Sequence, residues 1–196
     1  YFLMVFLSLV TCFAGQNLQN DPKPPRGFWN NTLIKFYLAL GLVELVDLSP
    51  EIPPDIEVFA DIVFKETEQR PLKLDIYRKK NIHQPAPVII FIHGGSWKTG
   101  NKKDYLIYLL YFAEKGYITA SLSYRFLQEA IFPAAVEDVR CGVNWIKKHG
   151  TNYGMDTNKI VLVGGSAGAY LAMMLGYSQD FQSCDSIYVS PQVQGV

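Results

Sequence analysis

The pattern of hydrophobic and polar residues changes near residue 56. Beyond this point, short β-branched and aromatic runs alternate with segments whose apolar residues recur every three or four positions. The runs predict strands and the segments predict amphipathic helices. Before residue 56 there are two long apolar segments, 1–14 and 33–48, which are followed by loops that contain proline.

The regular region begins with a predicted hairpin. Its two strands, 58–64 and 72–77, are joined by a mostly polar link, and the second alternates between apolar and charged residues. This alternation is typical of a strand with one buried face. The run 88–92, Val-Ile-Ile-Phe-Ile, contains no polar residue, which indicates a strand covered on both faces inside a parallel sheet.

Strands and helices alternate through the rest of the chain. We predict strands over 117–124 and 159–163, helices over 104–115 and 167–176, and a helix that Pro133 opens and Gly150 closes. A last apolar segment begins at Ile187 and runs toward the end of the chain, where residues 193–196 resemble the opening of a strand. This order predicts an α/β fold: a mostly parallel sheet with right-handed crossovers and helices on both faces.

Residues 1–14 carry no charged side chain, and the sequence turns polar after Gly15. This is typical of the core of a secretory signal peptide, and it is shorter than the roughly 20 residues of a membrane-spanning helix. We expect 1–15 to be a signal peptide and the protein to be secreted or periplasmic, or membrane-associated if the signal is retained. A buried or anchoring helix is the alternative. Because Tyr1 is not a start methionine, we expect the chain to be truncated at its N-terminus.

Residues 16–55 are expected to form an N-terminal extension with a helix over 33–48. This helix has few polar residues, so it must bury against the main domain, or serve as a lid over a hydrophobic pocket or as a membrane-surface helix. The chain has three cysteines. Cys12 would leave with the signal, and we favour Cys141 and Cys184 as free core residues over a pair.

Composition excludes several classes of protein. Hydrophobic residues make up 49% and charged residues 18%, which is unlike a disordered chain. The 18 basic and 18 acidic residues give a net charge of +0, so we expect no nucleic-acid partner. Neither CxxC nor HExxH spacing occurs, so a structural or catalytic zinc site has no support. We also expect no metal and no cofactor, because the chemistry considered below needs neither.

The sequence Gly-Gly-Ser-Ala-Gly at 164–168 follows a predicted strand and opens a predicted helix. This context is required of the G-x-S-x-G nucleophile elbow, in which a serine sits on a sharp strand-to-helix turn. Ser166 is therefore the candidate nucleophile. A glycine-rich turn that only packs, or that binds a phosphate, is the alternative.

The sequence His-Gly-Gly-Ser-Trp at 93–97 follows the predicted interior strand. Backbone N–H groups in such a loop, and the one after the nucleophile, form the oxyanion hole of α/β-hydrolases. Gly94, Gly95 and Ala167 are the candidates. We reject His93 as catalytic base, because its place at the strand end favours holding the loop by hydrogen bonds. Trp97 either walls the pocket or belongs to the core.

The charged residues Asp138 and Arg140 lie on the helix that Pro133 opens. We interpret them as a structural ion pair or as part of a solvated face.

Four segments together resemble the α/β-hydrolase esterases of the carboxylesterase, acetyl-xylan and feruloyl esterase, and hormone-sensitive-lipase-like group. They are HGGSW, SLSYR at 121–125, FPAAVEDV at 132–139 and VLVGGSAGAYLA at 161–172. The resemblance covers about residues 56–196 and implies a serine nucleophile at Ser166 and an oxyanion hole at Gly94, Gly95 and Ala167.

The order of the triad in this fold is Ser, then Asp or Glu, then His. All three histidines precede Ser166: His83, His93 and His149. Two aspartates follow it, Asp180 and Asp185, but they belong to the loop directly after the predicted helix and not to the end of a later strand. We therefore expect the triad acid and histidine beyond residue 196, residues 56–196 to be an incomplete domain, and the 196-residue piece alone to be inactive.

The expected activity of the whole protein is hydrolysis of carboxylic esters, on a small molecule or on a polysaccharide. Two alternatives remain: an amide hydrolase of the formamidase or peptidase kind, and a non-catalytic binding protein of the same fold. We expect no stable membrane span after signal removal.

Overall fold

The computed structural model describes residue 40, residues 50–177 and residues 193–196. The chain from Leu48 onward forms one compact unit. The predicted signal peptide, the predicted helix over 33–48 and the apolar segment at 187 lie outside the described residues.

Among the described residues, five strands form one mixed sheet in the order β1-β2-β4-β3-β5. Strands β1 and β2 are antiparallel, as are β2 and β4, whereas β3 runs parallel to both β4 and β5. The predicted hairpin and the predicted interior parallel strand are thus confirmed. The strands are β1 (Ile56–Lys65), β2 (Leu72–Lys79), β3 (Ala86–Ile92), β4 (Ile118–Leu122) and β5 (Met155–Gly164).

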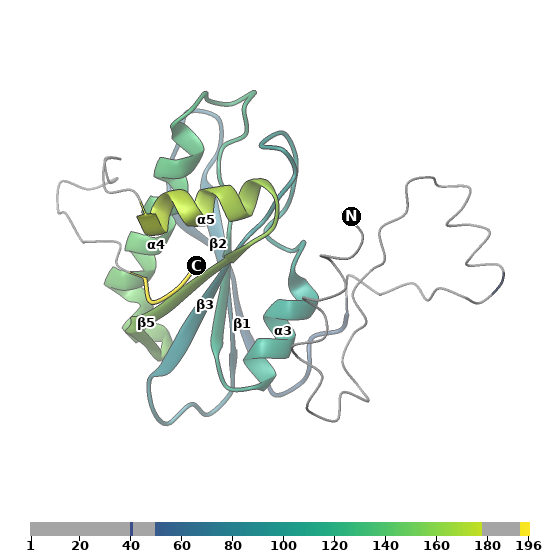
Figure 1. Cartoon of the computed structure of the whole chain (residues 1–196). Helices are drawn as coiled ribbons and strands as arrows, with labels where there is room; N and C mark the ends of the chain where they lie inside the picture. Colours follow the sequence, from purple (N-terminus) through teal and green to yellow (C-terminus); the bar gives the residue numbers. More distant parts are fainter. Residues whose placement is uncertain (1–39, 41–49, 178–192) are drawn as a thin grey trace, which may run out of the picture. The chain divides into compact units, whose positions relative to one another are not determined.

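Helices cover both faces of this sheet, α3 on one and α4 with α5 on the other (Figure 1). The helical elements are α3 (Leu106–Glu114), α4 (Ala134–His149), the 3-10 turn η2 (Gly150–Tyr153) and α5 (Ala167–Tyr177). The predicted helix at 104 begins two residues later, because Asp104 closes a turn instead: its carboxylate accepts the N–H of Asn101 at 2.9 Å. Helix α4 follows Pro133 and ends at Gly150, as predicted.

The uninterrupted apolar sequence of β3 is explained by its interior place between β4 and β5. Ile90 and Ile92 lie in the cluster beneath α4 and α5, and Ile89 and Phe91 lie in the cluster beneath α3. All four are buried. Burial of apolar surface on both faces stabilises this strand strongly, so the end of β3 is a firm support for the loop that follows.

The outer edge of β5 pairs with the described residues near the end of the chain. The Leu162 N–H donates to the carbonyl of Gly195 at 3.0 Å, and the Gln194 N–H donates to Ile160 at 2.7 Å. A parallel bridge joins Val161 and Gly195. The predicted opening of a strand at 193–196 is therefore confirmed at this bridge.

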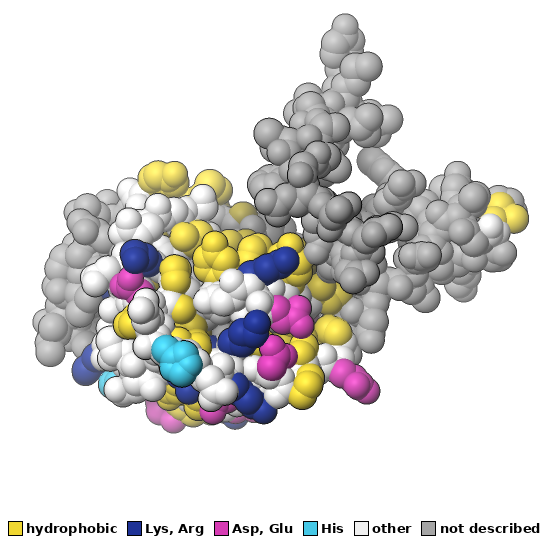
Figure 2. All heavy atoms as spheres, turned by 90° about the horizontal axis from the view of Figure 1, so that it is seen from below, with side chains coloured by type: hydrophobic (Ala, Val, Ile, Leu, Met, Phe, Trp, Pro, Cys, Tyr) yellow, Lys and Arg dark blue, Asp and Glu magenta, His cyan; other side chains and the backbone are white. Residues whose placement is uncertain are grey.

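Charges of both signs mix on the surface. On the described part of the face in Figure 2, Lys and Arg side chains lie among Asp and Glu side chains, and no extended patch of one sign forms. No helix within the described residues is long and apolar enough to cross a membrane.

Cys141 corrects a prediction. The sequence favoured a free core cysteine, but Cys141, although buried, is disulfide-bonded. The other two cysteines, Cys12 and Cys184, lie outside the described residues. Burial alone did not distinguish the two states, because a free cysteine and a half-cystine both suit an apolar environment.

Candidate active site

Ser166 lies in the turn between β5 and α5, exposed to solvent and with a left-handed φ of +54°. A residue with a side chain adopts this conformation at a cost of about 1–3 kcal/mol, and such residues cluster at functional sites. The turn is tight on the helix side, because a Cβ on Gly168 would overlap the carbonyl of Ile92 and lie 2.7 Å from that of His93. Glycine at 168 therefore lets α5 approach β3 closely enough to fix the serine.

The two glycine motifs meet at this turn. A Cβ on Gly94 would lie 2.8 Å from the carbonyl oxygen of Gly165 and 3.5 Å from Cβ of Ser166. Within residues 50–177 and 193–196, the N–H groups of Gly94, Gly95 and Ala167 donate to no protein acceptor. The structure thus places Gly94 beside Ser166, which Ala167 follows directly in the chain, and Gly95 is the neighbour of Gly94 in the loop after β3.

The loop after Gly94 is held in an uncommon backbone conformation. Gly95, Ser96 and Trp97 have φ values of +110°, +54° and +57°. The Gly95 carbonyl accepts the N–H of Lys98 at 3.0 Å and that of Thr99 at 3.1 Å. Glycine adopts a positive φ at little cost, but Ser96 and Trp97 carry side chains and are strained, so the surrounding contacts must hold the loop in place.

His93 is one of these contacts. Its ring is buried and stacks on Tyr124 with centroids 4.3 Å apart, and its Nδ1 lies 2.8 Å from the Gly94 carbonyl. A carbonyl only accepts, so Nδ1 carries the proton. Tyr124 donates its hydroxyl hydrogen to the His93 carbonyl at 2.9 Å. Burial lowers the pKa of His93, which keeps the ring neutral at pH 7.

This arrangement fits the predicted role of His93 in holding the loop. Within the described part of the chain, no histidine side chain is hydrogen-bonded to Ser166.

A buried ion pair anchors the same loop farther along. Lys102 Nζ lies 2.5 Å from Oδ2 of Asp75 in β2, whose side chain is fully buried. The other oxygen, Oδ1, accepts the N–H of Asp61 at 2.7 Å. Lys102 also lies 3.3 Å from the Asp61 carboxylate and holds the pKa of that carboxyl below its usual 3.8. No local sequence pattern predicts this anchor, because its members come from three separate segments.

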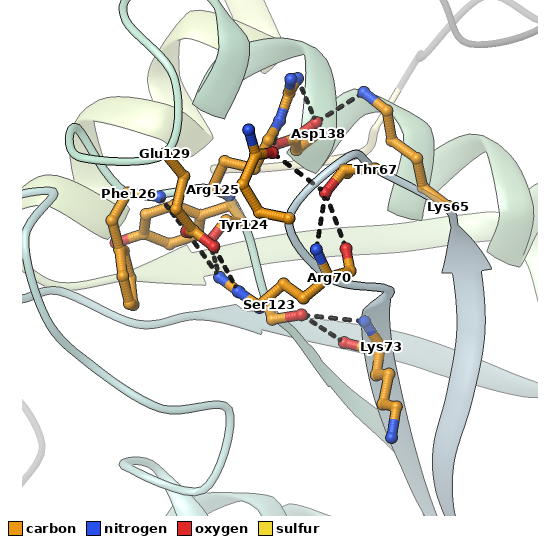
Figure 3. A network of polar contacts seen from close by, with 11 residues as sticks. Lys65, Thr67, Arg70, Lys73, Ser123, Tyr124, Arg125, Phe126, Glu129 and Asp138 are labelled. Atoms are coloured by element: carbon orange, nitrogen blue, oxygen red, sulfur yellow. Dashed lines mark hydrogen bonds and ion pairs between the residues drawn. The ribbon is translucent and has the colours of Figure 1, made fainter.

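Asp138 centres a second polar network, drawn in Figure 3, which decides between the two interpretations considered for this residue. Its side chain is fully buried and pairs with Arg125 at 2.7 Å and Lys65 at 2.6 Å. Arg140 is 1% exposed. A solvated face was therefore the wrong reading for both residues, although Asp138 does belong to a structural ion pair.

An apolar cavity of about 340 Å³ opens near the turn. Tyr170, one helical turn after Ser166, contributes to its wall and meets Trp97 edge-on, with ring centroids 5.6 Å apart. Trp97 also packs against the main core cluster, so it fills both of the roles considered for it. The lining residues are Trp97, Arg125, Leu127, Ala130, Phe132, Ala135, Val136, Tyr170 and Leu171.

No group of three or more His, Cys, Asp or Glu residues in the described part of the chain is placed to hold a metal ion.

Residues 74–194 match the model of the BD-FAE family. The chain belongs to this family of α/β-hydrolase esterases. The resemblance and the α/β-hydrolase fold predicted from the sequence are thereby confirmed.

The chain is similar in sequence to two proteins of Mycobacterium tuberculosis. The chain is 36% identical to the probable carboxylic ester hydrolase LipM over 104 residues, which is 52% of this chain and 24% of LipM. It is 33% identical to esterase LipC over 106 residues, 53% of this chain and 26% of LipC. The chain thus spans about a quarter of the length of these relatives.

The fold is similar to that of esterase 2 from Thermogutta terrifontis. Its apo form matches with a TM-score of 0.64 and 29% identity, over 74% of this chain and 54% of that one. Other structures of the same esterase are bound to propionate, bound to butyrate or phosphorylated by paraoxon.

Proposed function

We propose that this chain carries the nucleophile and the oxyanion hole of a serine hydrolase that cleaves carboxylic esters. The observation that supports the proposal most is the exposed Ser166, held at a left-handed φ next to Gly94. Among the described residues, the N–H groups of Gly94, Gly95 and Ala167 have no protein acceptor. Membership of an esterase family gives independent support.

In the proposed reaction, Oγ of Ser166 attacks the ester carbonyl carbon while a base removes its proton. The N–H groups of Gly94, Gly95 and Ala167 stabilise the oxyanion of the tetrahedral intermediate. The alcohol leaves with the proton from the base, and water releases the acid from the acyl enzyme and restores Ser166.

We assign the base to none of the three histidines of the sequence. His93 is buried with Nδ1 engaged at Gly94, and neither His83 nor His149 is hydrogen-bonded to Ser166 in the described residues. The proposed reaction therefore needs a base other than these three histidines. Activity is a property of the whole protein.

The substrate we propose is an ester with a small acyl group and an apolar part, either free or attached to a polysaccharide. The apolar lining of the cavity near Ser166 supports the apolar part. The propionate and butyrate bound by the Thermogutta esterase support a short acyl group.

We also propose a secreted or periplasmic location. The disulfide at Cys141 supports it, because disulfides persist mainly in oxidising compartments.

Ser166→Ala tests the function in the whole protein with p-nitrophenyl acetate. Loss of the nucleophile should lower kcat by on the order of 10⁴-fold or more. Ser123→Ala, just after β4, is the matched control, because among the described residues its hydroxyl bonds only to the backbone of Lys73 in β2. It should keep most of the activity.

Intact-mass analysis after treatment with paraoxon separates the alternatives. A wild type that hydrolyses the ester and is phosphorylated at Ser166 supports the proposal. Phosphorylation without ester hydrolysis would favour an amide hydrolase, and a wild type inert in both assays would favour a non-catalytic binding protein.

A further inference from the structure

Tyr105 reaches the residue that immediately precedes Ser166. It stands directly before α3, on the face of the sheet opposite α5. A methyl group on Gly165 would overlap the Tyr105 hydroxyl, whereas the ring carbon Cζ would stay at 3.7 Å, an ordinary van der Waals distance. The hydroxyl therefore occupies the space that a side chain at position 165 would take.

Tyr105 is held in place both at its ring and at its backbone. Its centroid lies 5.7 Å from that of Phe91 in the buried strand β3. Its carbonyl accepts the N–H of Leu109 at 2.9 Å, in the first turn of α3. Burial raises the pKa of the Tyr105 phenol, and a hydrogen bond from the backbone of Gly165 acts in the opposite direction. The phenol is protonated at neutral pH.

Tyr105 contacts the turn through a side chain, whereas Gly94 and Gly168 contact it through backbone atoms. Gly168 meets the carbonyls of Ile92 and His93, and Gly94 meets the carbonyl of Gly165, so both are contacts of backbone with backbone. Tyr105 adds a side chain on a third side. A strained φ such as that of Ser166 persists only when its surroundings fix it firmly.

We propose that Tyr105 is a positioning residue for Ser166, and that its hydroxyl and the missing side chain of Gly165 form an interlock that fixes the turn before the nucleophile. This inference rests on the proposed role of Ser166. Tyr105 acts through Gly165 and takes no part in bond making or proton transfer.

The interlock is tested by a double-mutant cycle in the whole protein, with kcat and KM for p-nitrophenyl acetate and the unfolding temperature as readouts. Tyr105→Phe removes only the oxygen. A displaced nucleophile should lower kcat by about tenfold, with KM nearly unchanged. Tyr108→Phe is the matched control, because Tyr108 is a neighbouring tyrosine that is 39% exposed. It should leave both constants unchanged.

Gly165→Ala supplies the second arm of the cycle. Alone, its methyl group collides with the hydroxyl and should lower kcat by about 100-fold and also lower the unfolding temperature. Combined with Tyr105→Phe, the same methyl group meets only Cζ at 3.7 Å. The double variant should therefore be more active and more stable than Gly165→Ala alone, which a general weakening of the fold would not produce.

Additive losses in the double variant of an active enzyme would overturn the interlock. So would a Tyr105→Phe variant whose kcat equals that of the wild type. A wild type without Ser166-dependent hydrolysis would instead overturn the proposed function and with it the positioning role, even if the unfolding temperatures showed rescue.

Discussion

Asp138 accepts three hydrogen bonds from one residue, Arg125. The backbone N–H of Arg125 lies 3.0 Å from Oδ2, Nε lies 2.7 Å from Oδ2, and Nη2 lies 2.8 Å from Oδ1. Lys65 donates a fourth at 2.6 Å. One fully buried carboxylate of α4 thus ties down the end of β1 and the segment after β4 (Figure 3), and that segment supplies part of the wall of the cavity.

We expect Asp138→Asn to lower the free energy of unfolding by about 3 kcal/mol, because loss of one member of a buried ion pair leaves the cationic partners without compensation. Urea unfolding followed by tryptophan fluorescence measures the change. Glu137→Gln, on the preceding residue of α4, should cost less than about 0.5 kcal/mol. Equal losses in the two variants would contradict the central role of Asp138.

The pair Glu129 and Arg70 predicts a dependence on pH. The two carboxylate oxygens accept Nε and Nη2 of Arg70 at 2.6 Å and 3.0 Å. The Arg70 guanidinium holds the pKa of Glu129 below its usual 4.5. Because the pKa in the folded state is the lower one, the pair stabilises the protein fully above about pH 4.5 and loses this effect as the pH falls through the folded-state pKa.

Glu129→Gln should therefore be less stable than wild type by about 1 kcal/mol at pH 7, and this difference should shrink below pH 4.5. Urea unfolding at pH 7 and at pH 3.5 measures both differences. Glu68→Gln, at an exposed glutamate, controls for the loss of one charge. A difference between Glu129→Gln and wild type that stays constant from pH 7 to pH 3.5 would argue against the ion pair.

Local patterns predicted the elements of the fold because each pattern has a single physical cause. The all-apolar run of β3 reflects its cover on both faces, and the glycines at 164–168 reflect a turn that a Cβ would obstruct. The candidate nucleophile Ser166 and the candidate donors at Gly94, Gly95 and Ala167 were predicted in this way. Their motifs are short, and backbone geometry alone requires their residue types.

Contacts between distant segments were not predictable from these patterns. The ion pair of Lys102 with Asp75 joins residues 27 apart, and Lys65 meets Asp138 across 73 residues. A charged residue in an amphipathic segment is normally expected to be exposed, so the sequence pattern did not predict the burial of Asp138. The place of Tyr105 beside Gly165 depends on how α3 and the sheet pack, which no local pattern records.

The contact of Gly94 with Gly165 gives the last prediction. A Cβ on Gly94 would lie 2.8 Å from the Gly165 carbonyl. Gly94→Ala must therefore move the oxyanion loop, the loop after β3 that carries the proposed donors Gly94 and Gly95, away from the turn. Since the donors then miss the oxyanion, kcat of the whole protein for p-nitrophenyl acetate should fall by roughly 10²–10³-fold. Gly116→Ala is the comparison: no heavy atom lies within 4 Å of its added Cβ, but its φ is +92°. It should cost about 1 kcal/mol of stability and spare kcat. Comparable kcat values in the two variants would remove the oxyanion loop from the mechanism.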